Sequence, residues 1–256
     1  MMRDGVLLAA GTLTAVPVPA PRTVDRAAAR VAMLIAPLAV LPLGVAVAAV
    51  LAAGGLLGLP APVIGLLAVG ALALGSRAFH LDGLSDTVDG LTASYDRERS
   101  LAVMKTGTAG PAGVVALVVV LGLQAAALGS LSTAGSTPLA GALLAGVAVL
   151  VSRCSLALCC ARGIPSARPG GLGDLYSGSV PRTGVLVSWA VAAAVLAALA
   201  PVAGLPWWRG LLAMLLAAAV VGLLIRHTTR RLGGVTGDVF GASVELSLAT
   251  ILLALT

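Results

Sequence analysis

The sequence predicts an all-α integral membrane protein, a polytopic bundle of about six or seven transmembrane helices. Of its 256 residues, 59% are hydrophobic and only 10% are charged, a composition far from that of a soluble domain. Aromatic residues make up only 3%, so the apolar mass is mainly Ala, Leu, Val and Gly, which favour packed helices over a membrane β-barrel. Apolar runs of about 20 residues recur along the chain, and each is long enough to cross the hydrocarbon core.

The N-terminal segment, residues 1–30, precedes the first apolar run. It has a basic residue and a short apolar stretch, as signal peptides do, but Asp4 and Gly5 make it a poor one. We expect this segment to stay in the mature chain and to lie at the membrane interface, with a turn at Pro17 and Pro19. The predicted spans that follow it are 31–53, 61–79, 110–130, 138–158, 183–203, 209–225 and 239–255.

Basic residues concentrate in alternate connections between these spans. The opposite connections contain only Arg209, and Trp207 and Trp208 there suit an interfacial anchor. The positive-inside rule therefore predicts that the N-terminus and the basic connections face the cytoplasm, where most of the arginines contact membrane lipids. Because the net charge of +6 is spread over short loops, it does not indicate a nucleic-acid partner. The basic residues are Arg22, Arg26, Arg30, Arg97, Arg99, Lys105, Arg162, Arg168, Arg182, Arg226, Arg230 and Arg231.

The densest acidic cluster is the string HLDGLSDTVDGL at 80–91. In a helix, Asp82, Asp86 and Asp89 stand at i, i+4 and i+7 and share one face. Three like charges close to the hydrocarbon repel each other and are costly to desolvate unless cations neutralise them. Because hard oxygen ligands suit magnesium or manganese better than zinc, the pattern predicts a Mg²⁺ site.

A second acidic cluster begins at GGVTGD, residues 233–238, and continues to Glu245. Asp238 and Glu245 are also seven residues apart, and Gly241 and Ala242 between them allow a helix or a phosphate to approach closely. Five of the ten acidic residues of the chain thus fall in two clusters at the same predicted membrane boundary. We expect the clusters to face each other across one cavity.

Three further side chains are candidates for the same site. His80 is either a catalytic or metal-binding residue or a hydrogen-bonding residue at a helix end, and the sequence leaves both open. Arg77 and Arg153 are candidate phosphate clamps, although snorkelling to lipid headgroups explains them nearly as well. By contrast, Asp96 and Glu98 alternate with arginines in a connection, so we interpret them as weak surface ion pairs.

The chain is predicted to form a single domain with two long polar segments. One is the acidic cytoplasmic-side segment 80–109, and the other is a cytoplasmic Gly/Pro loop at 161–182 without helical period. The cysteines lie together in an apolar stretch without the spacing of a zinc site, so we interpret them as buried small residues. They are Cys154, Cys159 and Cys160.

Several strings resemble the signature segments of the cobalamin synthase family, also called adenosylcobinamide-GDP ribazoletransferase. The two long ones are HLDGLSDTVDGL at 80–91 and LGGVTGDVFGASVEL at 232–246. GTLTAVPVP near the start, RERSLAVMK followed by GPAG, and ARPGGLG at 167–173 are similar to further family segments in the same order. The resemblance covers essentially the whole chain.

This resemblance implies a magnesium-dependent enzyme in the cytoplasmic (inner) membrane of a bacterium or archaeon, with its active site facing the cytoplasm. It implies that adenosylcobinamide-GDP is joined to α-ribazole or its 5'-phosphate, giving adenosylcobalamin or its 5'-phosphate and GMP. The oligomeric state stays open, and a homo-oligomer is compatible with the sequence. The site residues that it implies are His80, Asp82, Asp86 and Asp89 in the first motif and Asp238 and Glu245 in the second.

The predicted mechanism has one or two Mg²⁺ ions held by Asp82, Asp86 and Asp89, with help from Asp238. A carboxylate of this set or His80 accepts the proton of the ribazole hydroxyl. The sequence departs from the family pattern after Lys105, where Thr106, Gly107 and Thr108 stand in place of an acidic residue and leave the metal count open. The predicted phosphate contacts are Arg77, Lys105, Arg153, Arg168, Gly170, Gly171 and Gly173.

Two other functions use buried carboxylates in membrane helices. CDP-alcohol phosphotransferases of phospholipid synthesis carry spaced aspartates, but their pattern expects an Ala-Arg pair that Ser85-Asp86 does not supply. A cation-coupled transporter or channel needs charges along a pathway, whereas the acidic residues here gather at one predicted membrane face. Both alternatives stay open at the level of the sequence.

Overall fold

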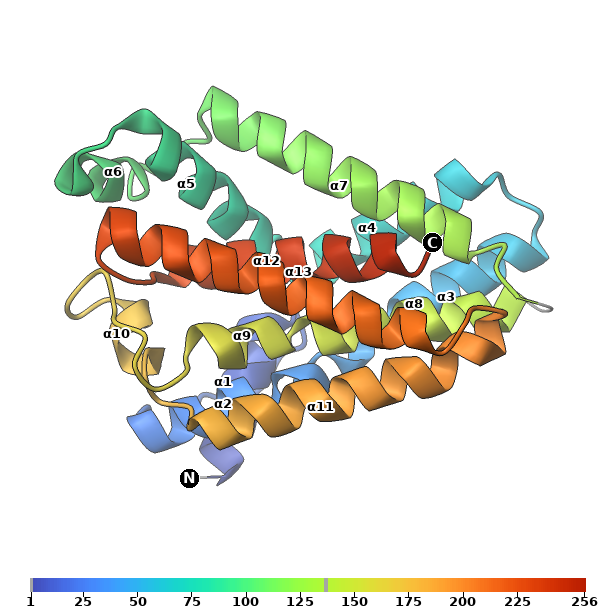
Figure 1. Cartoon of the computed structure of the whole chain (residues 1–256), viewed down its shortest axis with the longest axis horizontal. Coiled ribbons are helices and arrows are strands. Elements are labelled where there is room, and N and C mark those ends of the chain that lie inside the picture. The colour runs from blue at the N-terminus through green and yellow to red at the C-terminus, as the bar shows by residue number, and fades with distance from the viewer. Residues whose placement is uncertain (1, 136–137) are drawn as a thin grey trace.

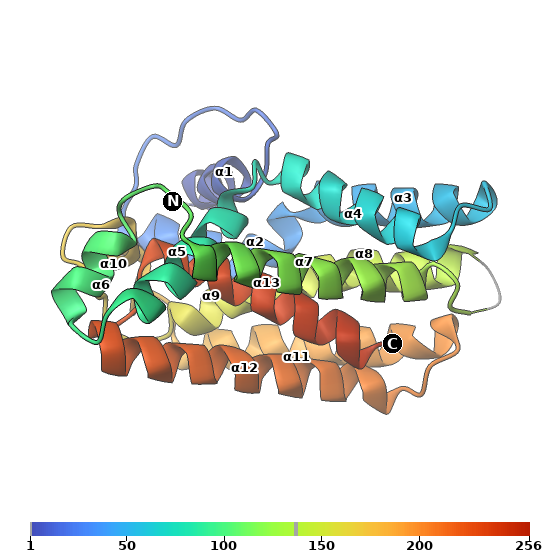
Figure 2. The same ribbon diagram turned by 90° about the horizontal axis from the view of Figure 1, so that it is seen from above.

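Long apolar helices run side by side and place their connections at two opposite ends of the molecule (Figures 1 and 2). The structure, a computed structural model, describes residues 2–135 and 138–256, and within them it contains helices and turns but no β-strands. The helices are α1 Met2–Leu13, α2 Arg26–Ala39, α3 Leu41–Leu56, α4 Ala61–Gly75, α5 Phe79–Ala93, α6 Arg97–Val103, α7 Pro111–Leu131, α8 Pro138–Ser152, α9 Cys154–Cys159, α10 Leu172–Tyr176, α11 Arg182–Leu199, the 3₁₀ turn η1 Ala200–Ala203, α12 Trp208–Leu232 and α13 Gly237–Ala254.

Six stretches of the described chain are long and apolar enough to cross a membrane, and a seventh crossing is obtained if the bent pair α4–α5 counts as one. The predicted polytopic helical membrane protein is therefore confirmed. Most predicted spans match within a few residues, although α12 continues seven residues past the predicted end at 225. The six stretches are Arg26–Leu56, Pro111–Leu131, Leu139–Cys159, Arg182–Ala203, Trp208–Leu232 and Gly237–Ala254.

The second predicted span, 61–79, differs from the structure. Helix α4 ends at Gly75, and α5 leaves it at an angle of 94°. Arg77 and Ala78 make this bend with positive φ angles of 57° and 54°, a backbone conformation that residues other than glycine rarely adopt. With 15 residues, α4 is shorter than the roughly 20 needed for a full crossing. The acidic string at 80–91 therefore lies on a separate helix, which packs between α7 and α13 (Figure 1).

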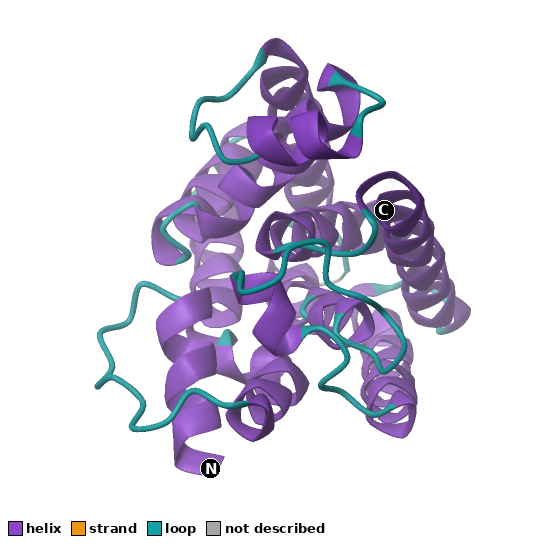
Figure 3. Cartoon of the chain, turned by 90° about the vertical axis from the view of Figure 1, so that its left-hand side faces the viewer, coloured by secondary structure: helices purple, strands orange, loops and turns teal. Residues whose placement is uncertain are grey.

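The four basic segments meet at one end of the bundle, as the sequence predicts. Arg30 Nε donates a hydrogen bond of 2.9 Å to the Ser179 carbonyl, which joins the first basic segment to the Gly/Pro loop. Arg97 Nε donates to the Leu232 carbonyl at 2.7 Å, and its Nη2 donates to the Ala167 carbonyl at 2.9 Å. Figure 3 views this end, where the connecting loops cross over the helix termini. These bonds tie the loops into one polar layer.

The N-terminal segment forms a helix, α1, that packs on α2. The backbone N–H of Arg22 donates to the Asp4 carboxylate at 2.8 Å, so the irregular stretch containing Pro17 and Pro19 folds back over α1. Arg77, which the sequence offered as a phosphate clamp, donates instead to the Gly11 carbonyl. It thereby connects the α4–α5 bend to α1.

Candidate active site

Two glycines allow α5 and α13 to cross at close range. A Cβ atom on Gly83 would lie 2.7 Å from the Asp238 carbonyl oxygen and 3.1 Å from the Gly241 Cα atom. A Cβ on Gly241 would lie 2.9 Å from the His80 carbonyl oxygen. Since real Cβ atoms essentially never approach backbone this closely, only glycine fits at these two positions. The crossing brings Asp82 and the following turn of α5 opposite the beginning of α13.

Asp82, Asp86 and Asp238 lie near this crossing. The charge of Asp86, a buried side chain, interacts with the charges of Asp82 and Asp238, and also with that of Asp89 on its own helix. Arg168, from the Gly/Pro loop, supplies positive charge, and its Nη1 lies 3.8 Å from Asp238 Oδ2. The predicted meeting of the two acidic clusters is thus seen for these three residues. Such a group of oxygen ligands beside an arginine is suited to binding a divalent cation together with phosphate.

A pocket of about 140 Å³, here called the polar pocket, lies beside Asp238. The Gly/Pro loop forms one wall, because the backbone N–H of Ala167 donates to the Val235 carbonyl at 2.9 Å and Val235 donates back to Pro165 at 3.0 Å. Thr236 caps α13 by accepting from the Val239 N–H, and its hydroxyl lies 3.2 Å from Asp238 Oδ2. The lining residues are Ser166, Arg168, Gly171, Gly173, Thr236, Gly237 and Asp238.

Two predicted phosphate contacts of this loop region lie differently. The Gly170 N–H donates to the Asp174 carboxylate at 3.0 Å, so this amide has a partner within the loop. Lys105 is exposed and lies with Arg168 along a neighbouring open groove on the surface. Of the predicted phosphate contacts, Arg168, Gly171 and Gly173 line the polar pocket.

Asp89 caps a helix. Its Oδ2 accepts from the Gly110 N–H at 2.7 Å and its Oδ1 accepts from the Gly113 N–H at 2.8 Å. Both oxygens thereby bind the N-terminal turn of α7, whose free N–H groups and positive dipole end favour a carboxylate. The structure therefore gives Asp89 a capping role, while its charge still acts on Asp86, and its predicted role as a metal ligand stays a prediction.

We expect Asp89→Ala to destabilise the protein by about 1–3 kcal/mol, because the partly buried N–H of Gly110 and the buried N–H of Gly113 lose their acceptor. Thermal unfolding of the purified protein in lipid nanodiscs measures this loss. Asp89→Asn retains one acceptor oxygen and should lose less. Equal unfolding temperatures for wild type and Asp89→Ala would show that the cap contributes nothing.

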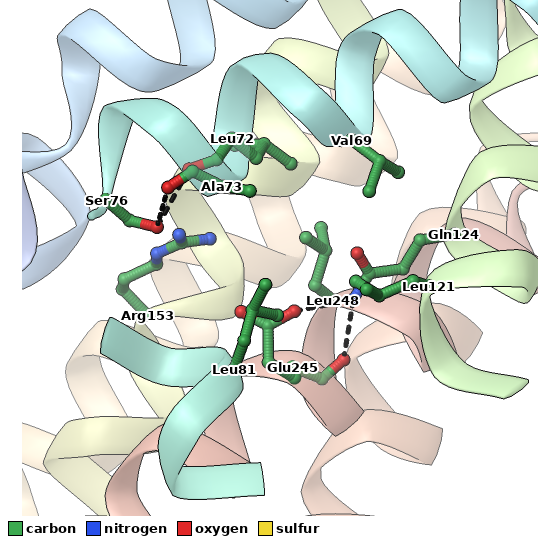
Figure 4. A pocket seen from close by; sticks show the side chains of 10 residues that line it. All are labelled: Val69, Leu72, Ala73, Ser76, Leu81, Leu121, Gln124, Arg153, Glu245 and Leu248. Carbon is green, nitrogen blue, oxygen red and sulfur yellow. Dashed lines mark hydrogen bonds between the residues drawn. The ribbon is translucent and has the colours of Figure 1, made fainter. Parts of the chain in front are cut away.

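Glu245 lies in a separate interior pocket (Figure 4). Its Oε2 accepts a hydrogen bond of 2.8 Å from Gln124 Nε2, and its backbone carbonyl accepts from the same amide at 3.2 Å. Arg153 lines this pocket too and donates to the Val149 carbonyl and the Ser152 hydroxyl, on its own stretch of chain. Glu245 and Arg153 are therefore not brought to the three carboxylates at the α5–α13 crossing.

His80 is located between the α5–α13 crossing and the interior pocket that contains Glu245. Its Nδ1 lies 4.0 Å from Glu245 Oε1, which is too far for a hydrogen bond. The side chain is 2% exposed, and neither ring nitrogen has a hydrogen-bond partner among the described residues. Such an unpaired buried imidazole is costly and calls for a partner.

The donor chemistry at the α5–α13 crossing fits magnesium. Magnesium usually binds through one or two carboxylates together with water and substrate phosphates, rather than in a closed protein cage. Within the part of the chain that the structure describes, no three His, Cys, Asp or Glu side chains converge on one point. Asp82, Asp86 and Asp238 offer carboxylate oxygens, the ligand type that magnesium prefers, and Asp238 lines the neighbouring polar pocket.

Gln124, Ser166 and Thr236 line these pockets but were not among the candidate site residues predicted from the sequence. Gln124 is a lone amide in an otherwise apolar span, a signal that points to a buried hydrogen-bonding role. Thr236 stands directly before the acidic end of α13, where threonine is a common helix cap. Ser166 carries no comparable signal, because its place in the pocket depends on how the Gly/Pro loop folds.

Comparison with known proteins shows the family of this chain. The profile of the family described as cobalamin-5-phosphate synthase matches residues 5–256. The adenosylcobinamide-GDP ribazoletransferase of Nocardioides sp. is 55% identical over 253 residues, covering 99% of this chain and 98% of its own. The protein of the same name from Frankia casuarinae is 36% identical and covers 95% of this chain and 91% of its own. No solved structure matches significantly. The chain therefore belongs to the cobalamin-5-phosphate synthase family.

Proposed function

We propose that this protein joins adenosylcobinamide-GDP to α-ribazole or its 5'-phosphate, forming adenosylcobalamin or its 5'-phosphate and releasing GMP. The identity of 55% with a curated adenosylcobinamide-GDP ribazoletransferase over nearly the whole chain supports this activity. The single structural observation behind it is the α5–α13 crossing, which gathers Asp82, Asp86 and Asp238 beside a polar pocket. Phosphoryl transfer needs that combination of negative ligands and phosphate-binding groups.

The residues of the polar pocket have distinct roles in this proposal. Arg168 neutralises charge on the phosphates of the nucleotide substrate, and its Nε, which has no partner among the described residues, is available to donate. Gly171 and Gly173 leave room for phosphate oxygens next to the loop backbone. Lys105, on the neighbouring groove, extends the positive surface toward the substrate.

Asp82, Asp86 and Asp238 are the proposed magnesium ligands. A bound Mg²⁺ ion supplies charge neutralisation on the diphosphate and on the departing GMP. The ribazole hydroxyl oxygen bonds to the cobinamide-side phosphorus as the bond from that phosphorus to the GMP oxygen breaks. The hydroxyl proton passes to a carboxylate of this group or to His80, and the bonding electrons leave with GMP.

We further propose that this site faces the cytoplasm. The four basic segments meet at the end of the bundle that holds the carboxylates, and the positive-inside rule assigns such an end to the cytoplasmic side. Nucleotide substrates are available there. The six apolar stretches make the protein an integral membrane protein.

GMP release tests the proposed function. Purified protein in nanodiscs is incubated with Mg²⁺, adenosylcobinamide-GDP and α-ribazole, and GMP and the cobamide are measured by liquid chromatography. We expect GMP only when both substrates and the metal are present. GMP formation without α-ribazole would indicate hydrolysis, and absence of GMP in the complete mixture would refute the proposal. Release of CMP from a CDP-alcohol with a lipid acceptor would instead identify a phospholipid enzyme.

A further inference from the structure

A second, largely apolar cavity of about 170 Å³ lies on the other side of the α13 N-terminus. It is partly open and is bordered by α1, α2, α9 and α10 together with the first residues of α5 and α13, at the same end of the bundle as the carboxylates (Figure 1). An engineered cavity of about 150 Å³ is known to hold a benzene molecule. This cavity is therefore large enough for an aromatic ring. Its lining residues are Leu8, Thr12, Leu13, Val24, Met33, Phe79, His80, Leu156, Leu175, Tyr176, Gly237, Phe240 and Gly241.

The lining concentrates the aromatic side chains of a chain that has very few. The protein contains two phenylalanines, two tyrosines and three tryptophans, and both phenylalanines and Tyr176 line this one cavity. Tyr176 and Phe240 meet edge to face, with ring centroids 6.3 Å apart and planes at 87°. Burial raises the pKa of Tyr176, so its phenol stays protonated. Aromatic walls in this arrangement favour a flat aromatic guest.

His80 also forms part of the cavity wall and is 2% exposed. Both of its ring nitrogens are fully buried, and Nδ1 lies 4.0 Å from Glu245 Oε1. His80 therefore adds to the wall of the cavity without presenting a polar atom to a guest.

The cavity and the polar pocket are neighbours. Gly237 lines both, with Asp238 on the polar side and Phe240 on the apolar side. One substrate with an apolar ring and a sugar can therefore occupy the cavity while its hydroxyl reaches toward the carboxylates.

We propose that this cavity binds the aromatic nitrogen heterocycle of the acceptor nucleoside. The identification of the guest as the base of α-ribazole rests on the proposed function. The cavity thereby selects a flat apolar base, whereas the polar pocket binds the nucleotide donor. The acceptor and the donor thus have separate binding sites on the two sides of Gly237.

The test fills the cavity with a larger side chain. Leu175 is a half-buried residue of the lining, and Leu175→Trp places an indole in the space of the guest. We expect this variant to raise the KM for α-ribazole at least about tenfold, without changing the KM for adenosylcobinamide-GDP. The matched control Leu186→Trp changes an exposed leucine of α11 and should behave as wild type.

Direct binding separates this proposal from the proposed function. Binding of 5,6-dimethylbenzimidazole to the full chain in nanodiscs is followed by saturation-transfer NMR without metal or nucleotide, so the result does not depend on turnover. We expect binding by wild type and Leu186→Trp and its loss in Leu175→Trp. The proposal would be overturned if Leu175→Trp left both benzimidazole binding and the KM for α-ribazole unchanged. It would also be overturned if the only effect of Leu175→Trp were to displace a lipid acyl chain from the cavity. Absence of GMP with retained benzimidazole binding would refute the reaction alone.

A second pair of variants tests the cavity even if Leu175→Trp does not fold. Leu8 lines the cavity from α1. Its neighbour Leu7 is also half-buried but does not line the cavity. Leu8→Phe should weaken benzimidazole binding and Leu7→Phe should not. Equal binding by these two variants would count against the cavity as the site.

Discussion

We expect Asp86→Asn to lower the rate of GMP release by about 1,000-fold, because a metal ion contributes several kcal/mol to a transition state of this charge. Asp86 is buried on α5, and its charge interacts with those of Asp82 and Asp238. The asparagine has nearly the same volume but removes the negative charge that attracts the cation. Single-turnover GMP release from saturating adenosylcobinamide-GDP measures the effect.

The control for this substitution is Glu98→Gln. Glu98 is an exposed carboxylate of α6 at the same end of the bundle, and its neutralisation changes the net charge by the same amount. It should leave GMP release within about twofold of wild type, because exposed charges act weakly. Comparable losses in the two variants would mean that general surface charge, and not a carboxylate site, controls the reaction.

Gly83→Val should both destabilise the protein and abolish its activity. The added Cβ would meet the Asp238 backbone at 2.7 Å, and overpacking of a tight contact costs about 1–3 kcal/mol or more. Such a cost lowers the melting temperature by roughly 2–12 °C in a chain of this size. Even a folded variant has α5 and α13 pushed apart, which separates Asp82 and Asp86 from Asp238.

Gly222→Val is the matched control, since a Cβ at Gly222 on α12 meets no atom within 4 Å. Differential scanning fluorimetry and GMP release are measured on both variants. We expect Gly83→Val to melt at a lower temperature and to release far less GMP than Gly222→Val. A Gly83→Val protein that melts and turns over like Gly222→Val would exclude the close helix crossing.

The membrane spans follow from the sequence because lipid imposes a simple constraint of length and apolarity. The gathering of basic segments at one end follows from alternation along the chain. The proximity of Asp86 and Asp238 was also predictable, since one acidic string follows a predicted span and the other begins one at the same membrane boundary. Small residues at Gly83 and Gly241 are the local signal of that crossing.

Other features depend on tertiary contacts that no periodicity records. Asp89 shares a helical face with Asp82 and Asp86, but only the arrival of α7 at that point turns it into a cap. The bend at Arg77 and Ala78 contains no glycine or proline, so nothing in the local sequence announces it. Glu245 lies almost two turns beyond Asp238 on α13, and that distance takes it into the interior with Gln124.

Binding of Mn²⁺, followed by electron paramagnetic resonance on the protein in nanodiscs, tests most directly whether α5 and α13 share one cation site. Wild type and Glu98→Gln should bind Mn²⁺ with equal affinity, and Asp86→Asn and Asp238→Asn should each bind at least about tenfold more weakly. Equal Mn²⁺ affinity in all four proteins, each correctly folded, would contradict the central claim that these carboxylates form a metal site.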